Sequence, residues 1–69
     1  MTDTKLLRLK IAESGYKMKF LASKLGITYQ GFLNKVDNKR EFTASEIALL
    51  SEILNLTKKE RDDIFLHRK

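Results

Sequence analysis

Two side-chain amides stand four residues apart in the middle of the chain, at Gln30 and Asn34. At about 100° per residue of a helix, Phe32 and Val36 point the same way and define a buried face, which leaves both amides on the opposite, outward face. An amide carries a donor beside an acceptor and can pair bidentately with the edge of adenine in the major groove. The alternative is an ordinary polar helix surface, where Gln and Asn are common.

The residues around these amides add groups that suit the outside of a duplex. Thr28 and Tyr29 lie at the N-terminal end of the same helix, which is the end that usually meets base edges. Lys35, Lys39 and Arg40 flank the helix where phosphates would lie. The pattern predicts a helix that contacts base edges while neighbouring cations hold the phosphate backbone.

Two short helices joined by a tight turn are predicted over residues 17–36, with the amides on the second helix. In the first helix Leu21 and Leu25 stand four apart and share one face. Gly26 has no Cβ, so it can take the left-handed conformation that ends a helix. Thr28 then supplies a side-chain oxygen to cap the free amides of the next helix.

Three more helices are predicted to hold this pair in place. The first is capped by Asp3 or Thr4 and ends at Gly15. Capping boxes at residues 43–46 and 57–60 open the other two, and the first of these ends near Asn55. The inward apolar residues are Leu6, Leu7 and Ile11 in the first of the three helices and Ile47, Leu50, Ile53 and Leu54 in the second.

The last predicted helix carries three consecutive apolar residues, Ile64, Phe65 and Leu66. Only part of such a run can face the chain's own core from a helix, so we expect one or two of them to be exposed. A dimer or partner contact is the functional interpretation of this run. The alternative is that the short helix folds back and buries it.

A chain of 69 residues makes one domain, spanning residues 1–69, and buries only about 60 % of its unfolded surface. It has no Cys, which excludes disulfides and thiolate metal sites. The single histidine, His67, has no partners for a zinc site, so we expect no metal and no cofactor. No apolar run approaches the roughly 18 residues of a membrane span, and the first residues do not resemble a signal peptide. We therefore expect a cytoplasmic protein without membrane contact.

The net charge of +5 is unevenly distributed. Residues 1–40 carry nine Lys and Arg against three Asp and Glu, a net +6, whereas residues 41–69 carry five against six, a net −1. Positive charge therefore gathers in the half that holds the helix pair, as expected if that half faces a polyanion. A plain solvated surface is the alternative explanation.

Catalytic groups are sparse. Asp62 and Asp63 are adjacent and diverge by about 100° on a helix, so they cannot form an acid and base pair. No His lies near a Ser, and the three Gly residues fall in no phosphate-binding pattern. We expect no enzymatic activity.

Several segments resemble the helix-turn-helix of the small phage repressor and Cro-like regulators, the lambda-repressor-like domain. They are Leu21-Ala22, Leu25-Gly26-Ile27, Phe32, and residues 29–35 taken with 38–43, while residues 42–57 resemble the fourth helix and the start of the fifth. The resemblance implies an all-α, compact five-helix bundle with its helix-turn-helix at about residues 17–36. It also implies a DNA-binding transcriptional regulator, usually a dimer on a near-palindromic operator, with the third helix in the major groove.

Residue roles follow from this resemblance together with the helix geometry. Base contacts are assigned to Tyr29, Gln30 and Asn34, and phosphate contacts to Lys17, Lys19, Thr28, Lys35, Lys39 and Arg40. Three features depart from the family pattern. Lys17 and Met18 stand where a Thr-Gln pair often caps the second helix and grips a phosphate, Gly31 lies inside the recognition helix, and Val36 falls one place later than the usual apolar position.

We interpret the chain as a small phage or prophage regulator that binds double-stranded operator DNA as a homodimer in a bacterial host. The alternative is an antirepressor-like module that binds a partner phage repressor. Met18, Gly31 and the apolar run at residues 64–66 favour the alternative.

Overall fold

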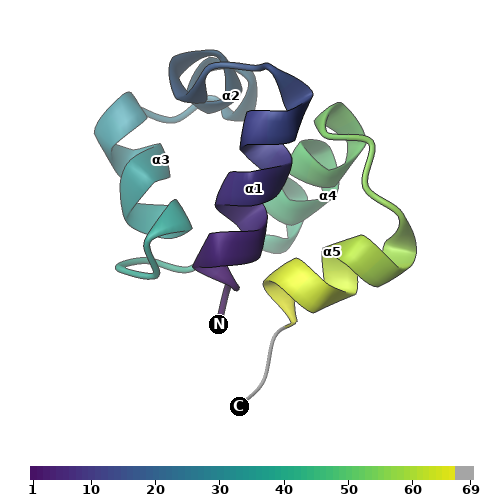
Figure 1. Cartoon of the computed structure of the whole chain (residues 1–69). Helices are drawn as coiled ribbons and strands as arrows, with labels where there is room; N and C mark the ends of the chain where they lie inside the picture. The colour runs from purple at the N-terminus through teal and green to yellow at the C-terminus, as the bar shows by residue number, and fades with distance from the viewer. Residues whose placement is uncertain (67–69) are drawn as a thin grey trace.

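Five helices follow one another along the chain in the computed structural model, which describes residues 1–66 (Figure 1). They are α1 (Thr4–Ser14), α2 (Met18–Leu25), α3 (Tyr29–Val36), α4 (Ala44–Ile53) and α5 (Lys58–Phe65). No strand occurs within this described range. The all-α prediction and the number of helices are confirmed, whereas His67 lies outside the described residues. None of the helices in residues 1–66 has both the length and the apolar character that a membrane span requires.

Side-chain oxygens start four of these helices at the predicted caps. Asp3 accepts a hydrogen bond from the Leu6 amide at 3.1 Å, and Thr28 accepts one from the Gly31 amide at 3.0 Å. Both predicted capping boxes are present, with Thr43 and Glu46 opening α4 and Thr57 and Glu60 opening α5. The helix starts are therefore set locally, by hydrogen bonds that satisfy amides with no partner inside the helix.

Left-handed residues end four of the helices. Gly15 and Gly26 have φ of 79° and 73°, as predicted for α1 and α2. Asn55 has φ of 55° just after α4, which is also as predicted. The fourth is Asn38, with φ of 64° after α3, which we did not predict. Each stop turns the chain sharply, so short helices can pack against one another.

The core draws on all five helices. It consists of Leu7, Ile11, Leu21, Ala22, Phe32, Val36, Phe42, Leu50, Ile64 and Phe65. Figure 1 shows α1 between α3 and α4, while α2 packs on both α3 and α4. The Cα radius of gyration is 10.7 Å, close to the roughly 11 Å expected of a compact domain of this length.

Candidate nucleic-acid interface

The outward face of α3 carries the predicted base-contact residues. Phe32 and Val36 have no exposed surface, which confirms the buried face that the spacing predicts. On the other side Tyr29 is 43 % exposed, Gln30 is exposed, and Asn34 is partly exposed. The three polar side chains therefore lie together on one accessible face of a rigid helix.

The two amides on this face are joined to each other. The Nε2 of Gln30 donates to the Oδ1 of Asn34 at 3.1 Å, a bond that spans one helical turn. It uses one of the two N–H groups of Gln30 and leaves the other N–H and the Oε1 acceptor available. Those two groups form the pair that adenine requires. The bond to Asn34 thus orients the Gln30 amide and leaves its adenine-pairing edge open when it uses the N–H that points away from Oε1.

Tyr29 connects the start of α3 to the start of α2. The ammonium of Lys19 lies 5.6 Å from the centre of the Tyr29 ring, within the range of a cation–π contact. An open hollow of about 530 Å³ lies beside this contact and is lined by Tyr16, Lys17, Met18, Lys19 and Tyr29. Two aromatic rings and two cations therefore border the same recess at the beginning of both helices.

The start of α2 has no side-chain cap. Lys17 holds the cap position in an extended conformation and makes no capping hydrogen bond. Met18 is partly buried and packs against the core, so it supplies no polar group to the helix start. The first amides of α2 thus lack a side-chain partner and carry the partial positive charge of a helix N-terminus, beside the exposed Lys17 and Lys19.

The Thr28 cap lies directly beside the glycine inside α3. A Cβ placed on Gly31 would lie 2.9 Å from the Oγ1 of Thr28, closer than two unbonded atoms of these kinds normally approach. A larger residue at this position would therefore require the Thr28 hydroxyl to shift slightly, whereas Glu46 and Glu60 occupy the same place beneath the intact threonine caps of α4 and α5. Thr28 is exposed, but its hydroxyl already accepts a hydrogen bond from the Gly31 amide and so serves as the cap of α3.

The loop after α3 places two cations at the opposite end of the face. Lys39 and Arg40 are exposed and form no salt bridge with any other residue of the described range. Their backbone amides both donate to the carbonyl of Asn34, at 2.8 and 3.3 Å. Lys17 and Lys19 are likewise exposed and without a salt bridge to any of residues 1–66. Two pairs of available cations thus flank the amide pair.

Lys35 has a different position from the one we expected. Its ammonium forms an ion pair with Glu46 at the start of α4, and its side chain is only 14 % exposed. Burial tends to raise the pKa of the Glu46 carboxyl, but the hydrogen bonds from Lys35 and the Thr43 amide outweigh it and leave the pKa lowered. Because its charge is neutralised inside the chain, we remove Lys35 from the predicted phosphate contacts.

The apolar run of α5 is divided between core and surface. Ile64 is fully buried and Phe65 is 6 % exposed, so both belong to the core of this chain, whereas Leu66 is 60 % exposed. Of the three predicted dimer or partner contacts, only Leu66 therefore remains a surface residue. It borders a groove of about 220 Å³ between α4 and α5, lined by Ala44, Ile47, Ala48, Arg61, Asp62, Phe65 and Leu66.

Four further residues near the face were not selected from the sequence. Tyr16 and Phe20 stack with their ring centres 5.0 Å apart, and Lys24 lies 5.5 Å from the Phe20 ring. Asn38 ends α3 and contacts the N-terminal segment. The sequence signal for Asn38 was its place just after a predicted helix, where Asn tolerates a left-handed backbone. The spacing of four between Tyr16 and Phe20 was the signal for the stack.

Comparison with models of protein families, with curated proteins and with solved structures finds no match for this chain. Within residues 1–66 no group of three or more His, Cys, Asp and Glu side chains is arranged to hold a metal ion.

Proposed function

We propose that this chain is a sequence-specific DNA-binding transcriptional regulator of the phage repressor and Cro type. In this proposal α3 enters the major groove of double-stranded operator DNA, and two copies bind a near-palindromic site in the cytoplasm of a bacterial host. The observation that carries the proposal is the amide pair of Gln30 and Asn34, exposed on one helix face between two pairs of available cations.

Base recognition rests on Gln30 in this proposal. Its remaining N–H and Oε1 match the N7 and N6 groups of adenine. Asn34 holds the amide in place, which reduces the entropy lost when Gln30 meets a base. Tyr29, at the first turn of α3 and under Lys19, offers a ring and a hydroxyl to the next base edge.

Phosphate contacts come from the two ends of the helix pair. Lys17, Lys19 and the uncapped amides of α2 lie at one end, and Lys39 and Arg40 lie at the other. Free amides at a helix N-terminus attract an anion, and nearby cationic side chains strengthen this attraction because both carry positive charge. Contacts on both sides of α3 fix its depth and orientation in a groove.

The decisive experiment compares binding to a selected duplex with binding to random duplex. A preferred sequence is first selected from a random duplex pool with the unaltered chain. Replacement of Gln30 by Ala is then expected to weaken binding to that sequence by about 1 to 3 kcal/mol while random duplex is bound almost as before. Equal losses on both duplexes would remove Gln30 from base recognition.

Lys39→Ala provides the complementary variant. It should weaken binding to both duplexes and reduce the slope of log K against log salt by about 0.9, the contribution of one phosphate contact. Lys58→Ala, which removes an exposed lysine at the start of α5, is the matched control and should leave the slope unchanged. If the unaltered chain binds no duplex at low salt, the proposed function is wrong.

The second candidate function is an antirepressor-like module that occupies a partner phage repressor. The groove between α4 and α5, with Leu66 exposed at its edge, favours it, because a recessed apolar surface suits a partner's side chain. The same groove would also serve a homodimer. Shift assays on DNA, with and without a partner phage repressor, separate the two functions. A pure antirepressor binds no DNA alone.

Sizing at several concentrations tests the dimer directly. Leu66→Asp should shift a dimer to monomer without unfolding the chain, because Leu66 lies outside the core. A strict monomer at every concentration would remove the dimer from the proposal.

A further inference from the structure

Asn38 occupies a helix end that has an exact structural counterpart in the same chain. After α3, the Asn38 amide donates to the Lys35 carbonyl and the Lys39 amide to the Asn34 carbonyl, at 3.3 and 2.8 Å. After α4, Asn55 and the residue that follows it make the same two bonds. Both asparagines have positive φ, and both helices therefore end in a Schellman motif. The backbone requirement is the same at the two positions.

The side chains of the two asparagines differ. The Oδ1 of Asn38 accepts from the Thr2 amide at 2.9 Å, and its Nδ2 donates to the Thr2 carbonyl at 2.7 Å. The same Nδ2 also donates to the Oγ1 of Thr4 at 3.2 Å. Asn38 thus pairs with both backbone groups of Thr2, as a neighbouring strand would. Asn55 is exposed and makes no side-chain hydrogen bond with the described residues.

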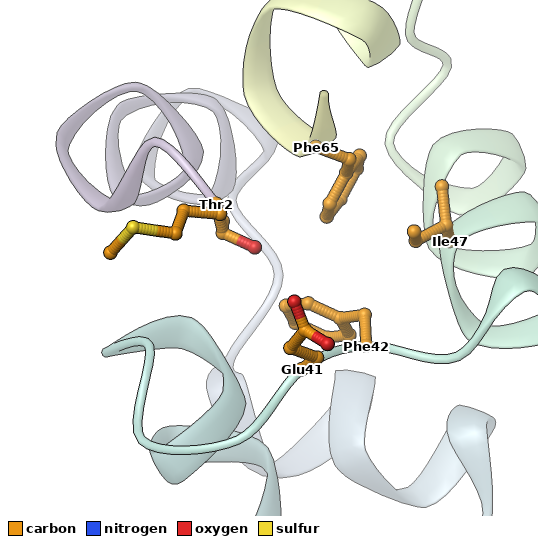
Figure 2. A pocket seen from close by; sticks show the side chains of 6 residues that line it. Thr2, Glu41, Phe42, Ile47 and Phe65 are labelled. Carbon is orange, nitrogen blue, oxygen red and sulfur yellow. The ribbon is translucent and has the colours of Figure 1, made fainter. Parts of the chain in front are cut away.

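The N-terminal segment that Asn38 holds is itself fixed to the core. Thr2 is only 9 % exposed, and the Asp3 amide donates to the Ile64 carbonyl of α5 at 2.7 Å. Figure 2 shows Thr2 and Phe65 at the same small pocket, with Phe42 of the segment between α3 and α4 facing them. The Oγ1 of Thr4 adds a bond to the Val36 carbonyl at the end of α3. Asn38 is therefore anchored to an ordered part of the chain.

The residues that directly follow Asn38 are the exposed cations Lys39 and Arg40. Ordering the backbone that carries these side chains when DNA binds costs conformational entropy, and a loop that is already held reduces this cost. A second link supports the same loop, since Arg8 of α1 forms a 2.7 Å ion pair with Asp37. Contacts at both Asp37 and Asn38 therefore hold the backbone that carries the two cations.

We propose that Asn38 is a positioning residue for DNA binding, which fastens the loop after α3 to Thr2 so that Lys39 and Arg40 meet the phosphates already ordered. The inference rests on the proposed function. It assigns to Asn38 a role through its neighbours, with no contact of its own to DNA.

The test is a double-mutant cycle on random-sequence duplex. Asn38→Gly keeps the left-handed backbone and the Schellman motif but removes the side-chain bonds to Thr2. With Lys39 and Arg40 present, it should weaken binding about tenfold, the scale expected from ordering about one backbone residue on binding. In a chain that also carries Lys39→Ala and Arg40→Ala, the same change should weaken binding less than about twofold. Asn55→Gly is the matched control and should have no effect in either background.

Hydrogen exchange provides a readout that is independent of DNA. The amides of Lys39 and Arg40 should exchange faster in Asn38→Gly and at the original rate in Asn55→Gly, because only the former releases the loop. If Asn38→Gly is too unstable to study, Thr2→Pro removes the N–H that Oδ1 accepts, and the same cycle applies.

The outcomes separate the two proposals. If the unaltered chain binds no duplex, the proposed function fails and the role of Asn38 fails with it. If the chain binds duplex but Asn38→Gly acts equally in both backgrounds, or leaves the Lys39 and Arg40 amides unchanged, only the positioning role is overturned.

Discussion

The two helix pairs of this chain are stabilised in different ways. Both α4 and α5 begin with complete capping boxes, and Glu46 and Glu60 in those boxes also pair with Lys35 and Lys10. By contrast, α2 has no side-chain cap, and α3 has a single hydroxyl cap over a glycine. Local stabilisation is thus concentrated away from the candidate interface. The difference suggests that α2 and α3 depend on the shared core and leave their termini and charges available for a ligand.

A chain of aromatic rings links the two pairs through that core. Phe32 of α3 meets Phe42 edge-on with ring centres 6.1 Å apart, and Phe42 meets Phe65 of α5 in the same way at 5.4 Å. Phe42 lies in the segment between α3 and α4 and is 8 % exposed. It is therefore one link between the two pairs, beside the packing of α2 on α4 and the ion pair of Lys35 with Glu46.

Phe42→Ala is expected to cause the largest loss in the free energy of unfolding, because it removes a contact between the two helix pairs. Removing a buried aromatic side chain costs about 3 to 5 kcal/mol, which approaches the total stability of about 4 to 10 kcal/mol expected for a domain of this length. Phe20→Ala is the control, because Phe20 is 40 % exposed and its stack with Tyr16 contributes only about 1 kcal/mol. Urea unfolding measures both. Similar losses for the two variants would show that the pairs do not depend on Phe42.

Lys17→Thr tests whether the uncapped start of α2 lowers the stability of the chain while it favours DNA binding. A threonine at this cap position should stabilise the chain by about 1 kcal/mol, because it can accept from an amide that now has no side-chain partner. The same change should weaken binding to random duplex and reduce the salt slope by about 0.9. Thermal unfolding and salt-dependent binding are measured on the same variant. A gain in stability with unchanged DNA binding would separate Lys17 from the interface.

The helices could be predicted because their boundaries depend on local chemistry. Asp3, Thr28, Thr43 and Thr57 start helices by bonding amides within the next three residues, so the sequence contains both partners. Contacts between distant residues could not be found in this way. The pairing of Asn38 with Thr2 spans 36 positions and depends on how the N-terminal segment lies against both the end of α3 and α5.

The candidate site was predicted in its outline but not in each charge. Helical spacing was sufficient to place Gln30 and Asn34 opposite Phe32, since all of them lie on one helix. Spacing did not reveal that Lys35 is paired with Glu46, because that partner belongs to another helix. It also left open which residues of the apolar run at 64–66 are buried. Burial of Ile64 and Phe65 depends on the angle at which α5 meets the core.

The smallest expected effect concerns acid, because Lys10 and Glu60 keep 25 % and 33 % of their side-chain surface exposed and solvent screens their ion pair. The hydrogen bonds from Lys10 and the Thr57 amide lower the pKa of Glu60 to about 2. A carboxyl whose pKa is lower in the folded state stabilises the fold above its unfolded pKa, and this contribution is lost as the pH falls toward the folded value. The thermal midpoint should therefore fall as the pH is lowered from about 5 to about 2. Glu60→Gln keeps an acceptor for the Thr57 amide but cannot titrate, so its midpoint should fall less over the same range. If the thermal midpoints of the unaltered chain and of Glu60→Gln change equally with pH, the pairing of Glu60 does not contribute to the stability of the fold.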